Sequence, residues 1–100
     1  MLHTVNKSPF EKNSLDTCLR LAQTGSDILL IEDAVYAALR DTAITDKVQQ
    51  ALSEHRFYAL GPDLKARGLE PERVLDGIEI VDYAGFVKLA ADNERCQTWL

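Results

Sequence analysis

Short apolar runs alternate along the chain with longer segments in which apolar residues recur every three or four positions. The run DILLIED at 27–33 is the clearest of the first kind. A continuous apolar stretch bounded by acidic residues is typical of a strand that is buried on both faces. Runs of similar character occur at three other places, so we predict four strands, over 2–6, 27–33, 56–60 and 78–83.

The segments between these runs have the residue spacing of amphipathic helices. In 45–55, for example, Val48, Ala51 and Leu52 fall on one helical face. Helices are predicted over 13–25, 34–41, 45–55 and 83–93, with a turn and a short helical piece over 61–69.

Polar residues at the predicted helix starts are expected to act as N-caps, because their side chains can accept hydrogen bonds from free backbone N–H groups. Residues in such positions are Asn13, Asp33, Thr45 and Asp82. Gly25 is placed to end the first helix, since glycine readily adopts the left-handed conformation that follows many helices.

Strands that alternate with helices predict βαβ units and a mainly parallel sheet. The expected fold class is therefore a small, doubly wound α/β fold of four strands with helices on both faces, forming one domain over 1–100. The last seven residues, ERCQTWL, are expected to form a tail outside the sheet. Its Trp99 and Leu100 are predicted to anchor a partner subunit, because tryptophan is enriched at interface hot spots.

The charge balance argues against two classes of partner. The formal net charge is −5, without a stripe of lysine and arginine, so direct binding to nucleic acid is disfavoured. No run approaches the roughly 18 apolar residues of a membrane span, and the first residues lack the basic start and apolar core of a signal peptide. We expect a cytoplasmic protein that does not insert into membranes.

Ligands of parallel α/β sheets bind beyond the carboxyl ends of the strands. Those ends are predicted at 6–8, 32–33, 61–63 and 82–83. They carry acidic residues but no cysteine, no histidine and no glycine-rich phosphate motif. Lys7 and Ser8 could hold an anion, although a solvated loop is the simpler interpretation. Glu32 and Asp33 could form an acid/base pair, but adjacent strand residues point to opposite sides.

The two histidines, His3 and His55, are isolated, so no metal site is expected. The two cysteines, Cys18 and Cys96, are the candidate reactive thiols. With Leu15 at 0° and about 100° per helical residue, Leu19 lies at about 40° and Cys18 at about 300°. Cys18 therefore lies at the margin of an apolar face, where a thiol can be a small packed hydrophobe or a reactive group. Cys96 lies in the tail, and a disulfide between the two is disfavoured in the cytoplasm.

Several stretches resemble the DsrH/TusB family, in order and over nearly the whole chain. They are LHTVNKSPF, LLIEDAVYAAL, YALGPDLKARGL, VDYAGFVKL and the closing QTWL. The stretch NKSPFEKNSLDTCL resembles the DsrH branch of sulfur oxidisers more than the TusB branch of tRNA thiolation.

The resemblance implies a DsrE/DsrF/DsrH-type fold and a function in sulfur relay without a cofactor. Family members form a cytoplasmic heterohexamer with DsrE/TusD-like and DsrF/TusC-like subunits, which passes persulfide sulfur to a DsrC/TusE-type carrier. In the DsrH branch the relay serves sulfur oxidation, and this is the expected function. The alternative is the TusBCD complex, which serves 2-thiolation of the wobble uridine in tRNA.

The resemblance also bears on the cysteines. The principal sulfur-carrying cysteine of the family belongs to the DsrE/TusD-type subunit, so this chain is expected to be a non-catalytic or assisting subunit. DsrH-type chains have a cysteine in the first helix, and Cys18 matches it, which makes Cys18 a candidate persulfide thiol. A third hypothesis is a free-standing sulfurtransferase that uses Cys18 alone.

Overall fold

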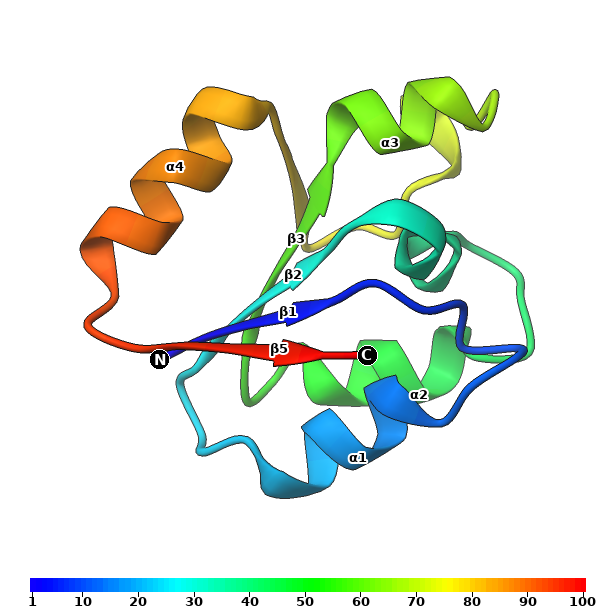
Figure 1. Ribbon diagram of the computed structural model, residues 1–100. Helices are drawn as coiled ribbons and strands as arrows, with labels where there is room; N and C mark the ends of the chain where they lie inside the picture. Colours follow the sequence, from blue (N-terminus) through cyan, green and yellow to red (C-terminus); the bar gives the residue numbers. More distant parts are fainter.

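The computed structural model describes all residues from Met1 to Leu100. Its centre is a parallel sheet of five strands in the order β4-β3-β2-β1-β5 (Figure 1). The strands are β1 (Leu2–Val5), β2 (Asp27–Leu30), β3 (Arg56–Leu60), β4 (Ile78–Val81) and β5 (Cys96–Trp99). The predicted parallel α/β fold is confirmed, but the sheet has one strand more than the four predicted.

Four α-helices and two 3₁₀ helices connect the strands. They are α1 (Ser14–Leu21), η1 (Glu32–Ala38), α2 (Thr45–Ala51), α3 (Gly61–Ala66), η2 (Pro71–Arg73) and α4 (Tyr83–Asp92). The segment predicted as a helix over 34–41 is thus a 3₁₀ helix that begins earlier. The first helix ends at Leu21 rather than at Gly25, because the backbone already becomes extended at Ala22.

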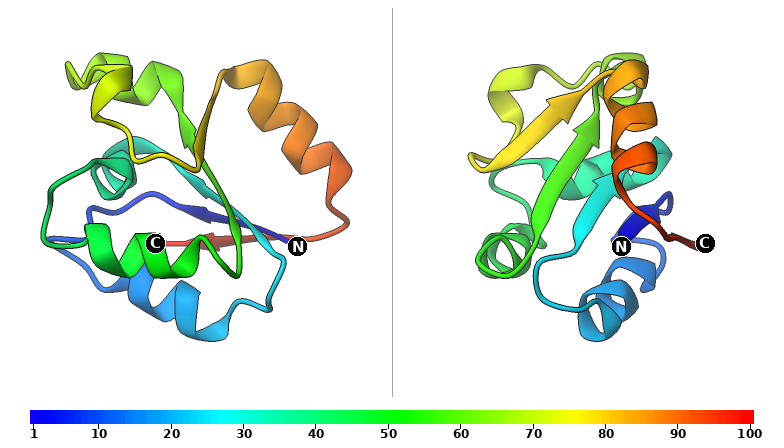
Figure 2. Two further views of the ribbon diagram at one scale, coloured as in Figure 1. Left: turned by 180° about the vertical axis from the view of Figure 1, so that it is seen from behind. Right: turned by 90° about the vertical axis from the view of Figure 1, so that its left-hand side faces the viewer.

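The order of the strands places the helices on two faces. From β1 to β4 the chain moves along the sheet in one direction, and then β4 connects to β5 at the other side of β1. Since parallel crossovers are right-handed, this reversal puts α4 on the face opposite to α1 and α2. The two views in Figure 2 show this arrangement, with α4 alone on its side of the sheet.

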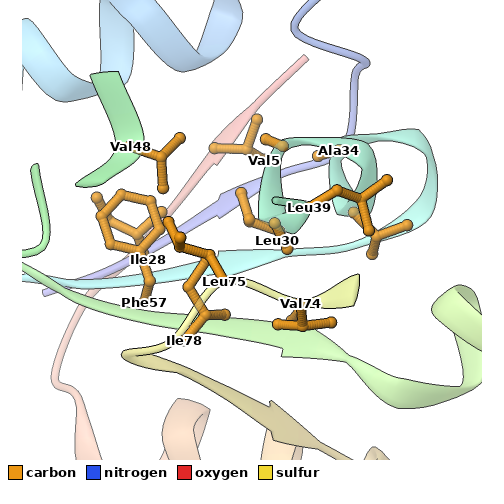
Figure 3. Packing of buried hydrophobic residues seen from close by; sticks show 14 of the residues in the cluster. Val5, Ile28, Leu30, Ala34, Leu39, Val48, Phe57, Val74, Leu75 and Ile78 are labelled. Atoms are coloured by element: carbon orange, nitrogen blue, oxygen red, sulfur yellow. The ribbon is translucent and has the colours of Figure 1, made fainter. Parts of the chain in front are cut away.

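The main core lies between the sheet and the side of α1, η1 and α2. The register aligns Ile28 with Phe57 and Phe57 with Ile78, so these side chains share one face of three neighbouring strands. They join Val48 of α2 in a cluster of 18 buried residues (Figure 3). The alternate strand positions face α4, and Leu2, Leu29 and Leu60 are buried there.

One predicted N-cap is confirmed. The Asp82 carboxylate accepts a hydrogen bond from the backbone N–H of Gly85 at 2.8 Å, at the start of α4. Asn13 precedes α1, but its side chain makes no capping hydrogen bond.

The other two predicted caps are wrong. Asp33 lies inside η1, where its carboxylate accepts hydrogen bonds from Nε and Nη2 of Arg67 at 3.0 and 2.9 Å. Thr45 is the first residue of α2, and its hydroxyl donates to the carbonyl of Leu39 at 2.9 Å. In both cases the side chain bonds to a group outside its own helix and not to the backbone N–H groups at the helix start.

Candidate functional site

The acidic residues at the carboxyl ends of the strands have structural partners. Besides the contacts of Asp33 and Asp82, the Asp63 carboxylate accepts a hydrogen bond from the backbone N–H of Glu32 at 2.6 Å. Glu32 itself has a positive φ of 50°, which this contact helps to hold. With Asp33 bound by Arg67, no pair of free carboxylates is available for acid/base chemistry.

The Lys7–Ser8 segment forms a turn. The Ser8 hydroxyl accepts from the backbone N–H of Phe10 at 3.2 Å, and its carbonyl accepts from Glu11 and Lys12. Lys7 is exposed. The backbone N–H groups of residues 10–12 are therefore used within the turn, which leaves the Lys7 ammonium and the Ser8 O–H as donors without a partner in the chain.

A hollow of about 400 Å³ lies between the end of β3, α3 and β4. It is lined by Gly61, Leu64, Lys65, Gly68, Leu69, Glu70, Pro71 and Ile80. It contains no thiol and no histidine, so its lining offers no nucleophile for sulfur transfer. No group of three His, Cys, Asp or Glu side chains is placed to hold a metal ion.

Cys18 belongs to the core. It lies on α1 with 0% exposure and is a member of the main hydrophobic cluster. Burial raises the pKa of its thiol to about 12, because the charged thiolate is poorly solvated there. At neutral pH the group is therefore protonated and inaccessible. Sequence periodicity placed it at the margin of the apolar face, and the structure places it fully inside.

Cys96 has the opposite character. It is exposed at the start of β5 and pairs with Leu2 in the sheet register. Its side chain belongs to the α4 side of the sheet, whereas Cys18 lies on the α1 side. The sheet separates the two free thiols, so they cannot form a disulfide without rearrangement of the fold.

The predicted tail is instead an integral strand. The Trp99 indole N–H donates to Nδ1 of His3 at 3.0 Å, and the Ser14 hydroxyl donates to the carbonyl of Leu100 at 2.7 Å. Trp99 packs partly against the main core, while the Leu100 side chain remains 77% exposed. The expectation of a tail outside the sheet is therefore wrong, because Trp99 belongs to β5 and its N–H bonds to β1. That Trp99 and Leu100 contact a partner subunit stays a prediction.

His3 makes the stability of β5 sensitive to pH. Burial lowers the pKa of His3 below its ordinary value of 6.5, and the N-terminal amino group and His55 lower it further. The neutral ring accepts the Trp99 N–H, whereas a protonated ring has no free lone pair on Nδ1.

We expect the free energy of unfolding to fall as the pH decreases from 6.5 toward the folded-state pKa. In that interval the unfolded state binds more protons at this site than the folded state does. The slope from this one group is at most about 1.4 kcal/mol per pH unit. Urea unfolding at several pH values checks this. A His3→Gln variant should show a shallower dependence, and an identical slope in both proteins would contradict the assignment.

No helix in the structure is long and apolar enough to cross a lipid bilayer.

The fold has counterparts among solved structures. The ychN protein from E. coli superimposes with a TM-score of 0.81 at 20% identity, over 98% of this chain and 97% of that one. A protein of unknown function from Methanobacterium thermoautotrophicum has a TM-score of 0.70 at 16% identity, over 97% of this chain and 95% of the other. At these identities the similarity concerns the fold alone.

Comparison of the sequence with known proteins identifies the family. Residues 7–96 match the model of the family described as DsrH like protein. Protein TusB of Pectobacterium parmentieri is 36% identical over 100 residues, covering 99% of this chain and all of that protein. Protein TusB of Erwinia tasmaniensis is 37% identical over 99 residues, again covering 99% of this chain and all of its relative. The chain therefore belongs to the DsrH/TusB family.

Proposed function

We propose that this chain is a TusB-type subunit of a cytoplasmic complex that relays persulfide sulfur for 2-thiolation of the tRNA wobble uridine. The observation that carries the proposal is the end-to-end similarity to proteins named TusB. This similarity favours the alternative, the tRNA pathway, over the expected function in sulfur oxidation.

The buried thiol supports an assisting role rather than a catalytic one. Persulfide transfer requires a thiolate that attacks the outer sulfur of the donor persulfide, and the attacking group must be ionised and accessible. Cys18 is neither, with 0% exposure and a pKa raised to about 12. The sulfur would therefore be carried by a cysteine of the DsrE/TusD-like partner and passed to a DsrC/TusE-type carrier.

The DsrH branch remains the second candidate. It is favoured by the position of Cys18 in α1, which matches the first-helix cysteine of DsrH-type chains. For this thiol to accept sulfur, α1 would have to move away from the sheet within the complex. A free-standing sulfurtransferase is the least supported hypothesis, because the isolated chain buries that thiol.

Co-expression with TusC- and TusD-like chains tests the proposal. We expect the three chains to purify together, and we expect the complex to restore 2-thiouridine in tRNA of a bacterial strain that lacks its own TusB. Nucleoside mass spectrometry measures the restoration. A Cys18→Ala variant should restore it to a similar level, since the thiol only packs. A chain that stays monomeric and restores no thiolation would refute the proposal.

A further inference from the structure

A further hollow lies at the amino ends of the strands, away from the carboxyl ends where parallel sheets usually bind ligands. Its volume is about 340 Å³. The first residues of β1 and β5, the end of α1 and the loop that leads into β2 meet there, on the left of Figure 1. We call it the amino-edge hollow; it is lined by Met1, His3, Leu21, Gln23, Ser26 and Arg95.

The ring of His3 offers the hollow a hydrogen-bond donor. His3 is 4% exposed, and its Nδ1 accepts the Trp99 indole N–H at 3.0 Å. A neutral ring that accepts on Nδ1 carries its proton on Nε2. No hydrogen bond within the chain uses Nε2, yet the only buried side-chain nitrogen and oxygen atoms without a partner are Oδ1 of Asn6 and Nδ1 of His55. Nε2 of His3 is therefore accessible, and its unpaired N–H faces the hollow that the ring lines.

Arg95 brings a full positive charge to the same hollow. Its backbone carbonyl accepts from the Leu2 N–H at 2.9 Å, which fixes the residue directly before β5. The four ion pairs of the chain belong to Arg40, Lys47, Arg56 and Arg67. The Arg95 guanidinium takes part in none of them and makes no hydrogen bond within the chain, so all its N–H donors are available to a ligand.

The lining of the hollow is positive, although the whole chain carries a formal net charge of −5. None of the 6 lining residues is acidic, and Glu94, the neighbour of Arg95, is not among them. The N-terminal amino group adds positive charge nearby, since it helps to lower the pKa of His3. The C-terminal end of α1 opposes an anion with about half an elementary charge, which is less than the full charge of the guanidinium.

The walls of the hollow are preformed. Ser26 is 6% exposed, and its hydroxyl and backbone N–H both donate to the Gln23 carbonyl, at 2.6 and 3.1 Å. These bonds close the turn between α1 and β2. Leu21 and Met1 are 66% and 48% exposed and supply apolar surface at the rim. The hollow thus combines fixed N–H donors with an apolar border, as sites for small organic ligands do.

We infer that the amino-edge hollow binds a small organic anion, whose carboxylate is held by the Arg95 guanidinium and by the Nε2–H of His3. The apolar part of this ligand lies on Leu21 and Met1. A guanidinium can bind both oxygens of a carboxylate through paired N–H···O bonds, and the imidazole N–H adds a further donor. The inference goes beyond the proposed function and does not depend on it, because the hollow contains no thiol that could take part in sulfur transfer.

Butanoate is the probe for this site, in an NMR titration of the full chain at constant ionic strength. Sulfate is the control anion without an apolar part, and 1-butanol is the control for the apolar part without charge. We expect butanoate to shift the backbone amide signals around the hollow and the Nε2 signal of His3 with one common, roughly millimolar dissociation constant. Sulfate should bind several-fold more weakly, and 1-butanol should leave these signals in place.

Two substitutions of arginine locate the binding. Arg95→Gln should weaken butanoate binding about tenfold or more, because the charge-assisted bonds are lost. Arg73→Gln is the matched control, since Arg73 is also exposed and belongs to η2, which does not line the hollow. Both variants should melt within a few degrees of the wild type without ligand, because neither side chain is buried. Leu21→Ala should weaken the binding of butanoate several-fold and leave that of sulfate unchanged.

The outcomes that would overturn the inference are distinct. Signals that move in proportion to butanoate concentration without saturation would show that there is no site. Equal butanoate binding by the wild type and a folded Arg95→Gln variant would place the anion elsewhere. Sulfate that binds as tightly as butanoate, with both unaffected by Leu21→Ala, would replace the organic ligand by an inorganic anion. None of these results bears on the relay complex, which co-expression tests separately.

Discussion

Deletion of residues 96–100 is expected to remove most of the folding stability of this protein. Strand β5 pairs with β1 along its whole length, from Leu2–Cys96 to Val5–Trp99. Without it, β1 becomes an edge strand, and the backbone groups that faced β5 lose their partners. Leu2 and Val5, both 0% exposed in the intact chain, would lie beside an open edge.

The size of the effect follows from the contacts that are lost. Each intramolecular hydrogen bond contributes about 1 kcal/mol net, and several ladder bonds disappear with β5. The deletion also removes the Trp99–His3 bond, the Ser14–Leu100 bond and the Thr4–Thr98 contact at 3.3 Å. Small domains have only about 5–15 kcal/mol of stability, so a loss of several kcal/mol leaves a substantial unfolded population.

Urea unfolding followed by circular dichroism measures this loss. The matched control is Leu100→Ala, which removes an exposed side chain but keeps the carbonyl that accepts from Ser14. The control should change the free energy of unfolding by less than about 0.5 kcal/mol. A truncated chain with the unfolding midpoint of the full chain would show that β5 is dispensable.

The fifth strand also shows where sequence reasoning reaches its limit. The four predicted strands are all in the structure, because buried strands of a parallel sheet leave continuous apolar runs such as that of β2. Strand β5 reads CQTW and has no such run, since it lies at the sheet edge with three of its four residues exposed. Its place depends on pairing with β1 at the other end of the chain, which local pattern does not reveal.

The candidate site, too, could be predicted only in part from the sequence. Helical periodicity placed Cys18 near an apolar face, and resemblance made it a candidate thiol. Neither could show that the sheet, α1 and the neighbouring core residues close over it completely. Likewise, Asp33 has the sequence position of a helix cap, but its carboxylate binds the guanidinium of Arg67, which lies 34 residues further along the chain. Long-range partners decide both outcomes.

The two thiols of the chain are expected to differ strongly in their rates of alkylation. We expect iodoacetamide to modify Cys96 readily in the native protein and to leave Cys18 untouched. With a pKa of about 12, the Cys18 thiol is ionised to only ~1 part in 10⁴ at pH 8. Because the thiolate is the reactive form, both this small ionised fraction and the burial of the sulfur predict very slow alkylation of Cys18.

Mass spectrometry of the alkylated chain gives the readout. In urea both thiols become exposed and should react at similar rates, which provides the internal control. A Cys96→Ser variant should stay unmodified in buffer and gain one label in urea. The same contrast should hold for a persulfide donor, with no added sulfur on Cys18 of the isolated native chain.

The result bears directly on the role that we propose for this chain. Sulfur transfer through Cys18 needs a state in which α1 opens, because the folded chain buries the sulfur atom. If partners induced that state, alkylation of Cys18 would accelerate within the assembled complex and not in the isolated chain. Labelling of Cys18 within tenfold of the Cys96 rate, or a sulfur adduct that Cys18→Ser removes, would refute the packing role and support a sulfur-carrying subunit.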